Sequence, residues 1–117
     1  MDTILMVGTR KGLWVGRSDE ARTTWTWTGP HFDMMEVYSC LIDVRGGRPR
    51  LFAGASSPWT GPQIQVSDDL GATWTPTRGA HFPDDVDASV ERIWQLVPGT
   101  ADGVLYAGTE PGAVFRS

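Results

Sequence analysis

The feature that most restricts the fold of this chain is an internal repeat with a period of about 50 residues. Short apolar segments recur three times, and each is followed by a second apolar segment that ends in serine, at Ser18, Ser67 and Ser117. The tripeptide Thr-Trp-Thr at 24–26 returns at 73–75 in the same register. Repetition at one period indicates copies of one supersecondary unit, each of which buries its apolar faces against its neighbours.

The middle repeat predicts four short strands, because apolar and polar residues alternate and Gly, Pro, Asp or Ser stands at each break. These strands are expected at about 37–43, 50–55, 63–67 and 73–78. No window of helical length keeps an apolar period of about 3.6 residues. Four antiparallel strands in a repeat of this length are typical of a β-propeller blade. We therefore expect an all-β chain with about two and a quarter blades, in units of about 1–36, 37–92 and 93–117.

The best-defined motif is the turn at 67–74, which has the pattern Ser-x-Asp-x-Gly-x-Thr-Trp known as an Asp-box. Aspartate can accept backbone N–H groups within a tight turn, glycine can adopt positive φ, and tryptophan offers a large apolar face for packing between blades. A weaker copy occupies 18–25, where Glu20 and Arg22 replace the aspartate and the glycine. The expected structural residues of the complete box are Ser67, Asp69, Gly71, Thr73 and Trp74.

The box and the blade pattern resemble the BNR/Asp-box propellers, a group that includes sialidases, sortilin-like receptors and photosystem assembly factors. The opening segment 7–13, followed by Gly-Pro-His-Phe at 29–32, is similar to bacterial proteins labelled as BNR-repeat or sialidase-like glycosyl hydrolases. The resemblance covers the whole chain and matches the N-terminal part of such proteins, which continue for several more blades. A closed propeller needs at least four blades. We therefore expect either a fragment or several copies that associate through open blade edges.

The resemblance implies that a ligand would bind on the face opposite the boxes. Two segments on that face are longer in the second repeat than in the first: 54–67, whose extra residues include 57–62 with Trp59, and the acidic segment 82–93. The candidate ligand-face residues are Arg10, Lys11, His31, Trp59, His81, Asp84, Asp85 and Asp87. The ligand could be a carbohydrate or a protein.

Each candidate also has a structural interpretation. Trp59 could stack on a ligand or pack on a neighbouring blade, and the acidic loop 83–87 could bind Ca²⁺ or be solvated. His31 and His81 occupy the same repeat position, which favours a structural role. Glu36 beside Tyr38 resembles the sialidase Glu/Tyr pair only by coincidence, because sialidases draw that pair from different blades.

Composition limits the remaining function classes. A formal net charge of −4, with scattered basic residues, argues against a nucleic-acid surface. The single cysteine, Cys40, excludes an internal disulfide and a Cys-rich metal site, and its apolar surroundings predict a buried thiol. No signal peptide and no apolar run of membrane-spanning length is present, so a cytoplasmic location without membrane contact is expected. The sequence predicts no cofactor and no metal site.

Three functions remain open on the sequence alone. The first is a binding or scaffold propeller segment without a complete catalytic site. The second is the N-terminal part of a sialidase-like glycoside hydrolase, and the third is a propeller of the assembly-factor kind. Sialidases open with an Arg-Ile-Pro type motif, and the nearest match, Glu91-Arg92-Ile93-Trp94, lacks the proline. This departure favours the binding or scaffold hypothesis.

Overall fold

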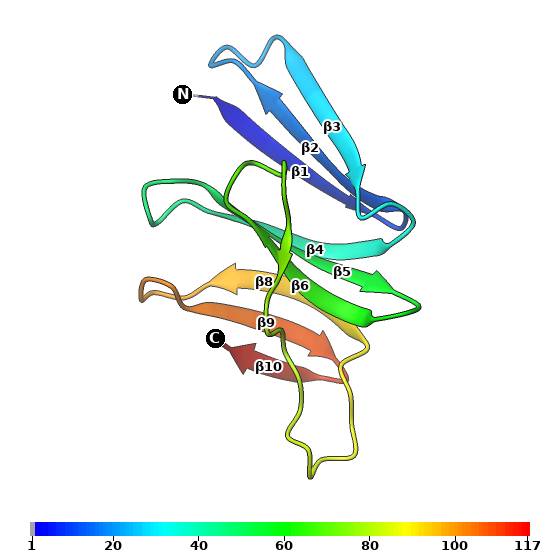
Figure 1. The fold of residues 1–117 in the computed structure, drawn as a ribbon. Coiled ribbons are helices and arrows are strands. Elements are labelled where there is room, and N and C mark those ends of the chain that lie inside the picture. The colour runs from blue at the N-terminus through cyan, green and yellow to red at the C-terminus, as the bar shows by residue number, and fades with distance from the viewer. Residues whose placement is uncertain (1) are drawn as a thin grey trace.

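The computed structural model describes residues 2–117, and this range contains ten strands and no helix (Figure 1). The strands form three antiparallel sheets with three, four and three members. The first sheet contains β1 (Thr3–Thr9), β2 (Gly12–Ser18) and β3 (Trp25–His31). The second contains β4 (Glu36–Asp43), β5 (Arg50–Ser57), β6 (Gly61–Ser67) and β7 (Thr75–Pro76). The third contains β8 (Arg92–Pro98), β9 (Leu105–Glu110) and β10 (Ala113–Arg116).

The expected all-β class and the four strands of the middle repeat are confirmed. The last of these strands is shorter than expected, because β7 covers only Thr75 and Pro76. A proline has no backbone N–H to donate to a ladder, which limits pairing at this edge. One further bond, from the Thr77 amide to the Ile64 carbonyl at 2.9 Å, prolongs the contact with β6.

Strand pairing shows which residues of different sheets occupy the same place, and we call such residues equivalent. Ser18 lies opposite Thr3 across β1 and β2, and Ser67 lies opposite Leu51 across β5 and β6. Ser117 meets Leu105 in the same way, through two hydrogen bonds of 3.0 Å. Strands β1, β5 and β9 therefore correspond, as do β2, β6 and β10. By the same registers β3 corresponds to β7, and β4 to β8.

The core consists of two apolar layers between adjacent sheets. The first interface, between the first and second sheets, buries Leu13, Val15, Val37, Leu51, Ala53 and Ala55. The second interface, between the second and third sheets, buries Phe52, Ile93, Leu96 and Ala107. Strand β5 contributes to both layers because alternate side chains of a strand point to opposite faces. Cys40 packs against the first layer as a half-buried thiol, and burial raises its pKa.

Glycine allows the first strand of the next sheet, β4 or β8, to approach closely. A Cβ added at Gly54 would lie 2.5 Å from Ser39 Oγ and 3.3 Å from Ile93 Cβ. A Cβ added at Gly8 would lie 2.6 Å from the carbonyl oxygen of Val37, which is the residue equivalent to Ile93. A larger residue at Gly8 would push β4 of the second sheet away, while one at Gly54 would clash first with Ser39 of its own sheet.

The turns lie at two opposite ends of the sheets. The β4–β5 and β8–β9 turns emerge at one end, and the β1–β2, β5–β6 and β9–β10 turns emerge at the other (Figure 1). Because the strands are antiparallel, the turn between β6 and β7 belongs to the first group. We call the end with the β5–β6 turn the Trp59 end.

Candidate ligand-binding surface

The turn at 67–74 is closed by the side chains of Ser67 and Asp69. Ser67 Oγ donates to Asp69 Oδ1 at 2.7 Å and accepts the Gly71 amide at 2.8 Å. Asp69 in turn accepts the Thr73 amide at 2.8 Å and the Thr73 hydroxyl at 2.5 Å. These bonds, first of all the one from the Thr73 hydroxyl, lower the pKa of Asp69 to about 2. Gly71 has a φ of 92°, a conformation in which a Cβ would be strained.

The shorter turn between β2 and β3 has a similar aspartate, one residue earlier than the sequence comparison suggested. Asp19 accepts the Thr23 amide at 3.2 Å and the Thr23 hydroxyl at 3.4 Å. The aspartate and the threonine are four residues apart in both turns. Aligning the two turns at their serines hid this correspondence, because Asp19 follows Ser18 directly while Asp69 stands two residues after Ser67.

The structure places His31 in the first interface, in contact with the turn of the second sheet. The Trp74 indole N–H donates to His31 Nδ1 at 3.4 Å, and the other ring nitrogen of His31 lies 2.9 Å from the Thr28 hydroxyl. The His31 and Phe32 rings both meet the Trp74 ring edge to face, with centroids 5.9 and 4.9 Å away. Burial lowers the pKa of His31, which favours the neutral ring that can accept the indole N–H.

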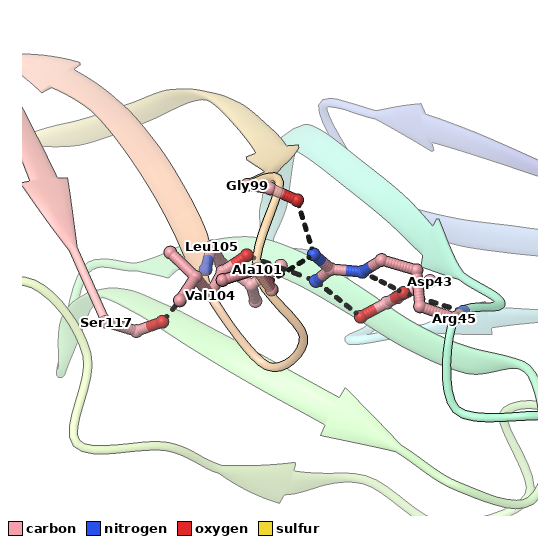
Figure 2. A network of polar contacts seen from close by, with 7 residues as sticks. All are labelled: Asp43, Arg45, Gly99, Ala101, Val104, Leu105 and Ser117. Atoms are coloured by element: carbon pink, nitrogen blue, oxygen red, sulfur yellow. Dashed lines mark hydrogen bonds and ion pairs between the residues drawn. The ribbon is translucent and has the colours of Figure 1, made fainter.

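At the end opposite Trp59, the side chain of Arg45 links the β4–β5 turn of the second sheet to the β8–β9 turn of the third by hydrogen bonds (Figure 2). Its guanidinium group donates to the carbonyl oxygens of Gly99, Ala101 and Val104 at 2.5, 2.9 and 3.1 Å. Asp43 orients this group through bonds of 2.9 and 3.0 Å, and the Arg45 side chain lowers the pKa of that carboxyl. The β4–β5 turn is therefore occupied by structural contacts with the β8–β9 turn.

At the other end, Trp59 is 92% exposed at the tip of the β5–β6 turn. Its backbone is nevertheless fixed, because Ser57 Oγ accepts the amides of Trp59 and Thr60 at 3.0 and 3.3 Å. Arg10 and Lys11 form the β1–β2 turn at the same end and are exposed. There, Thr9 Oγ1 accepts the Lys11 amide at 3.1 Å. A hydroxyl residue at the start of each turn thus holds both turns in place.

The other four candidate ligand residues do not lie in the turns of the Trp59 end. His81 is exposed beside the second interface, and Asp84, Asp85 and Asp87 are exposed in the β7–β8 connection, which projects past the third sheet (Figure 1). Within residues 2–117, no three His, Cys, Asp or Glu side chains gather in a way that could hold a metal ion. The structure therefore does not bring the eight candidate residues into one site.

A cluster that the sequence analysis missed lies on the edge strands β4 and β8 and at the end of β9. The rings of Tyr38 and Trp94 meet edge to face with centroids 5.1 Å apart. Arg92 Cζ lies 5.9 Å from the centroid of each ring. Arg92 also pairs with Glu110 at 2.8 Å, which raises the pKa of the arginine. We call Tyr38, Arg92, Trp94 and Glu110 the aromatic–arginine cluster.

The cluster depends on two bulges that recur in the repeat. The pairing register of β4 and β5 shifts between Val37 and Ser39, and that of β8 and β9 shifts between Ile93 and Gln95. Tyr38 and Trp94 are the residues at these bulges, which often redirect a side chain. Arg92 begins β8 and Glu110 ends β9, so the cluster lies toward the Trp59 end. The recurring apolar–aromatic pairs Val37-Tyr38 and Ile93-Trp94 are the sequence signal that could have revealed it.

Comparison with known proteins gives no assignment: no family model matches this chain, and no curated protein matches it. The part of the chain that the structure describes also contains no helix that is long and apolar enough to cross a membrane. The function is therefore argued from the geometry above.

Proposed function

We propose that this chain is a segment of an Asp-box β-propeller that acts as a binding or scaffold module. Three observations support the architecture: successive antiparallel sheets that repeat one strand register, apolar layers between them, and the serine–aspartate–threonine closure of the 67–74 turn. In this proposal the units of about 1–36, 37–92 and 93–117 are blades, and the turn at 67–74 is an Asp-box.

The observation that carries the binding role is the exposed indole of Trp59 on a fixed turn. An indole that is 92% exposed leaves its apolar faces in water, which is unfavourable unless a ligand covers them. Because Ser57 Oγ holds the Trp59 and Thr60 amides, little turn entropy would be lost when a ligand binds. The geometry suits an aromatic platform on which a flat apolar face can stack.

The aromatic–arginine cluster supplies the second part of the proposed surface. It combines two ring faces with a cation and a carboxylate, Arg92 and Glu110, both of which are about two-fifths exposed. Sugars present apolar C–H faces together with hydroxyl groups, so rings and charged hydrogen-bonding groups in combination suit them. We therefore infer that the ligand is a carbohydrate, and that a protein ligand is the alternative outcome of the test.

The test is binding of the purified chain to an array of fluorescent neutral and sialylated oligosaccharides. Trp59→Ala should weaken binding at least about tenfold, or about 1.4 kcal/mol. It should change the free energy of unfolding by no more than about 0.5 kcal/mol, because the side chain is exposed. Trp27→Phe, on β3, is the matched control and should leave binding unchanged. Equal binding by the chain and by Trp59→Ala would contradict the proposed surface.

The proposal also implies that the chain does not hydrolyse a bound sugar. Most glycosidases need two carboxylates on either side of the scissile bond, and sialidases use a tyrosine as the nucleophile. We expect no turnover of a fluorogenic sialoside. Turnover that is abolished by Asp85→Ala or Glu36→Ala would replace the binding role with a hydrolase role.

A further inference from the structure

Glu91 places a second carboxylate beside the aromatic–arginine cluster, in addition to Glu110. It directly precedes Arg92, and its backbone amide donates to the Glu110 carbonyl oxygen at 2.8 Å. Arg92 and Glu110 lie opposite each other across β8 and β9, so the backbone of all three charged residues is held in one place. The Glu91 side chain is exposed, and within residues 2–117 it forms no ion pair.

Glu36 adds a third carboxylate from the adjacent sheet. It begins β4, and the pairing registers make it equivalent to Arg92, which begins β8. The hydroxyl of Ser39 donates to the carbonyl oxygen of Ile93 at 2.9 Å and so holds β4 beside β8. Glu36 is half-buried, and in the part of the chain that the structure describes it forms no ion pair either.

The carboxylates outnumber the cation that they surround. Glu110 raises the pKa of Arg92 through its hydrogen bond, and the charges of Glu91 and Glu36 raise it further. Three carboxylates therefore act on one guanidinium group, and the surroundings of the two rings are negative overall. Opposite charges attract a ligand, and like charges exclude one. The excess of carboxylates favours a cationic ligand over an anionic one.

Arg92 itself shows that the rings of this cluster accept a cation. Its guanidinium carbon lies 5.9 Å from the ring centroids of both Tyr38 and Trp94. A cation near an aromatic face is attracted by the negative face of the ring. The Arg92 side chain is 41% exposed, so it does not seal the rings and carboxylates from solvent. A second cation that arrives with a ligand would meet the same kind of surroundings.

We propose that this cluster selects carbohydrates that carry a protonated amino group. The rings stack on the apolar face of the amino sugar, and its ammonium group lies among the carboxylates of Glu36, Glu91 and Glu110. The same carboxylates repel an acidic sugar. This inference rests on the proposed carbohydrate surface and names the class of sugar that the surface prefers.

The probes are two oligosaccharides that share a backbone and differ in the charge of their amino groups: a tetramer of glucosamine and its fully N-acetylated counterpart. Each is titrated into the full chain by isothermal titration calorimetry at low salt and pH 5.5, where glutamates are ionised and the amines are protonated. We expect the glucosamine tetramer to bind at least about tenfold more tightly. The preference should shrink at about 1 M salt, where charges are screened within about 3 Å.

Variants of the chain assign the preference to the cluster. Glu36→Gln combined with Glu91→Gln should reduce the preference to about threefold or less, because most of the excess negative charge is removed. Arg92→Gln should instead increase it severalfold, since the competing cation is lost. Asp102→Asn, at an exposed position between β8 and β9, is the matched control for a lost carboxylate and should keep the full preference.

Two results would overturn this inference and leave the proposed carbohydrate surface standing. One is equal affinity for the two tetramers, or tighter binding of the N-acetylated one. The other is a preference that the double glutamate variant retains in full, because the amine would then be bound elsewhere.

Further outcomes separate the sugar from its charge. A tetralysine peptide that binds as tightly as the glucosamine tetramer would also overturn the inference, because the cluster would then recognise charge alone. Saturable binding of neither tetramer would overturn both the inference and the proposed function. An amine preference that Trp59→Ala leaves unchanged, with undiminished affinity, would support the inference and contradict the proposed Trp59 platform.

Discussion

The two interfaces of this molecule are built from equivalent strands, but within residues 2–117 a turn with a tryptophan covers only the first of them. In the first interface the 67–74 turn packs over the apolar layer, and Trp74 touches both His31 and Phe32. In the second interface the corresponding positions leave a groove lined by Phe52, Ile64 and Leu105. In the first interface the turn with its tryptophan therefore covers the apolar layer that the two sheets form.

The comparison also separates two uses of polar side chains. Ser67 and Asp69 have their hydrogen bonds satisfied inside their own turn, so this turn can sit against an apolar layer at small cost. Arg78 and Arg116 face solvent at the edge of the open groove. Internal hydrogen bonding therefore accompanies packing in the first interface, whereas the groove of the second interface carries exposed charge at its edge.

Replacing the equivalent leucines Leu51 and Leu105 by alanine should give the largest losses in the free energy of unfolding. Leu51→Ala should destabilise the chain by about 4 kcal/mol, because a fully buried leucine leaves a cavity. Leu105→Ala should cost about 2 kcal/mol, since its side chain is only half-buried. Urea unfolding of both variants measures the difference. Equal losses would show that the two interfaces are packed alike.

Trp74→Ala should destabilise the chain by about 3 kcal/mol, through loss of the aromatic side chain that covers the first interface. Thermal and urea unfolding of the variant provide the measurement, with Trp27→Phe as a control tryptophan on the same sheet stack. A loss below about 1 kcal/mol would mean that the turn does not close the interface.

A fall in pH should destabilise the 67–74 turn by protonating the Asp69 carboxylate. Its pKa is lowered to about 2, from an ordinary value of 3.8, so its contribution to stability is complete above pH 4 and is lost as the pH falls toward 2. Asp69→Asn removes this titration. Urea midpoints measured from pH 5 to pH 2 should fall more steeply for the unmodified chain than for the variant. Parallel pH profiles would rule out a stabilising role of the Asp69 carboxylate.

The smallest expected effect concerns His31, whose pKa burial lowers. A histidine with a lowered pKa in the folded state stabilises most above its ordinary value of 6.5 and loses that contribution as the pH falls below it. Protonation would also place a proton on Nδ1, which accepts the Trp74 indole N–H. Stability should therefore decline slightly from pH 7 to pH 5, and less in His31→Phe. An NMR titration that gives His31 a pKa above 6.5 would contradict this.

Much of the fold could be predicted from the sequence because it depends on local patterns. Alternation and turn residues in the middle repeat predicted β4, β5 and β6 to within a few residues. The fourth strand of the middle repeat was predicted at 73–78, but β7 covers only Thr75 and Pro76, since Pro76 limits pairing there. The Asp19 turn was misaligned because spacing from the serine differs by one residue between the two turns.

The candidate site was harder to predict because its parts meet only across sheets. Tyr38 and Trp94 are far apart in the sequence, and two bulges bring their rings together. Trp59 could be selected from its turn alone, but its exposure of 92% is seen only in the structure. Similarly, the role of His31 depends on its contact with Trp74, which repeat position alone did not specify.

Residue-resolved amide hydrogen exchange in the native state tests the central claim most directly, because it reports local opening free energies at equivalent positions. The amides of Ala53 and Ala107 occupy the same place in β5 and β9. We predict slower exchange at Ala53, where Trp74 covers the layer, and loss of this difference in Trp74→Ala. Equal protection at the two amides in the unmodified chain, or a difference that survives in Trp74→Ala, would contradict the claim that this turn closes the first interface.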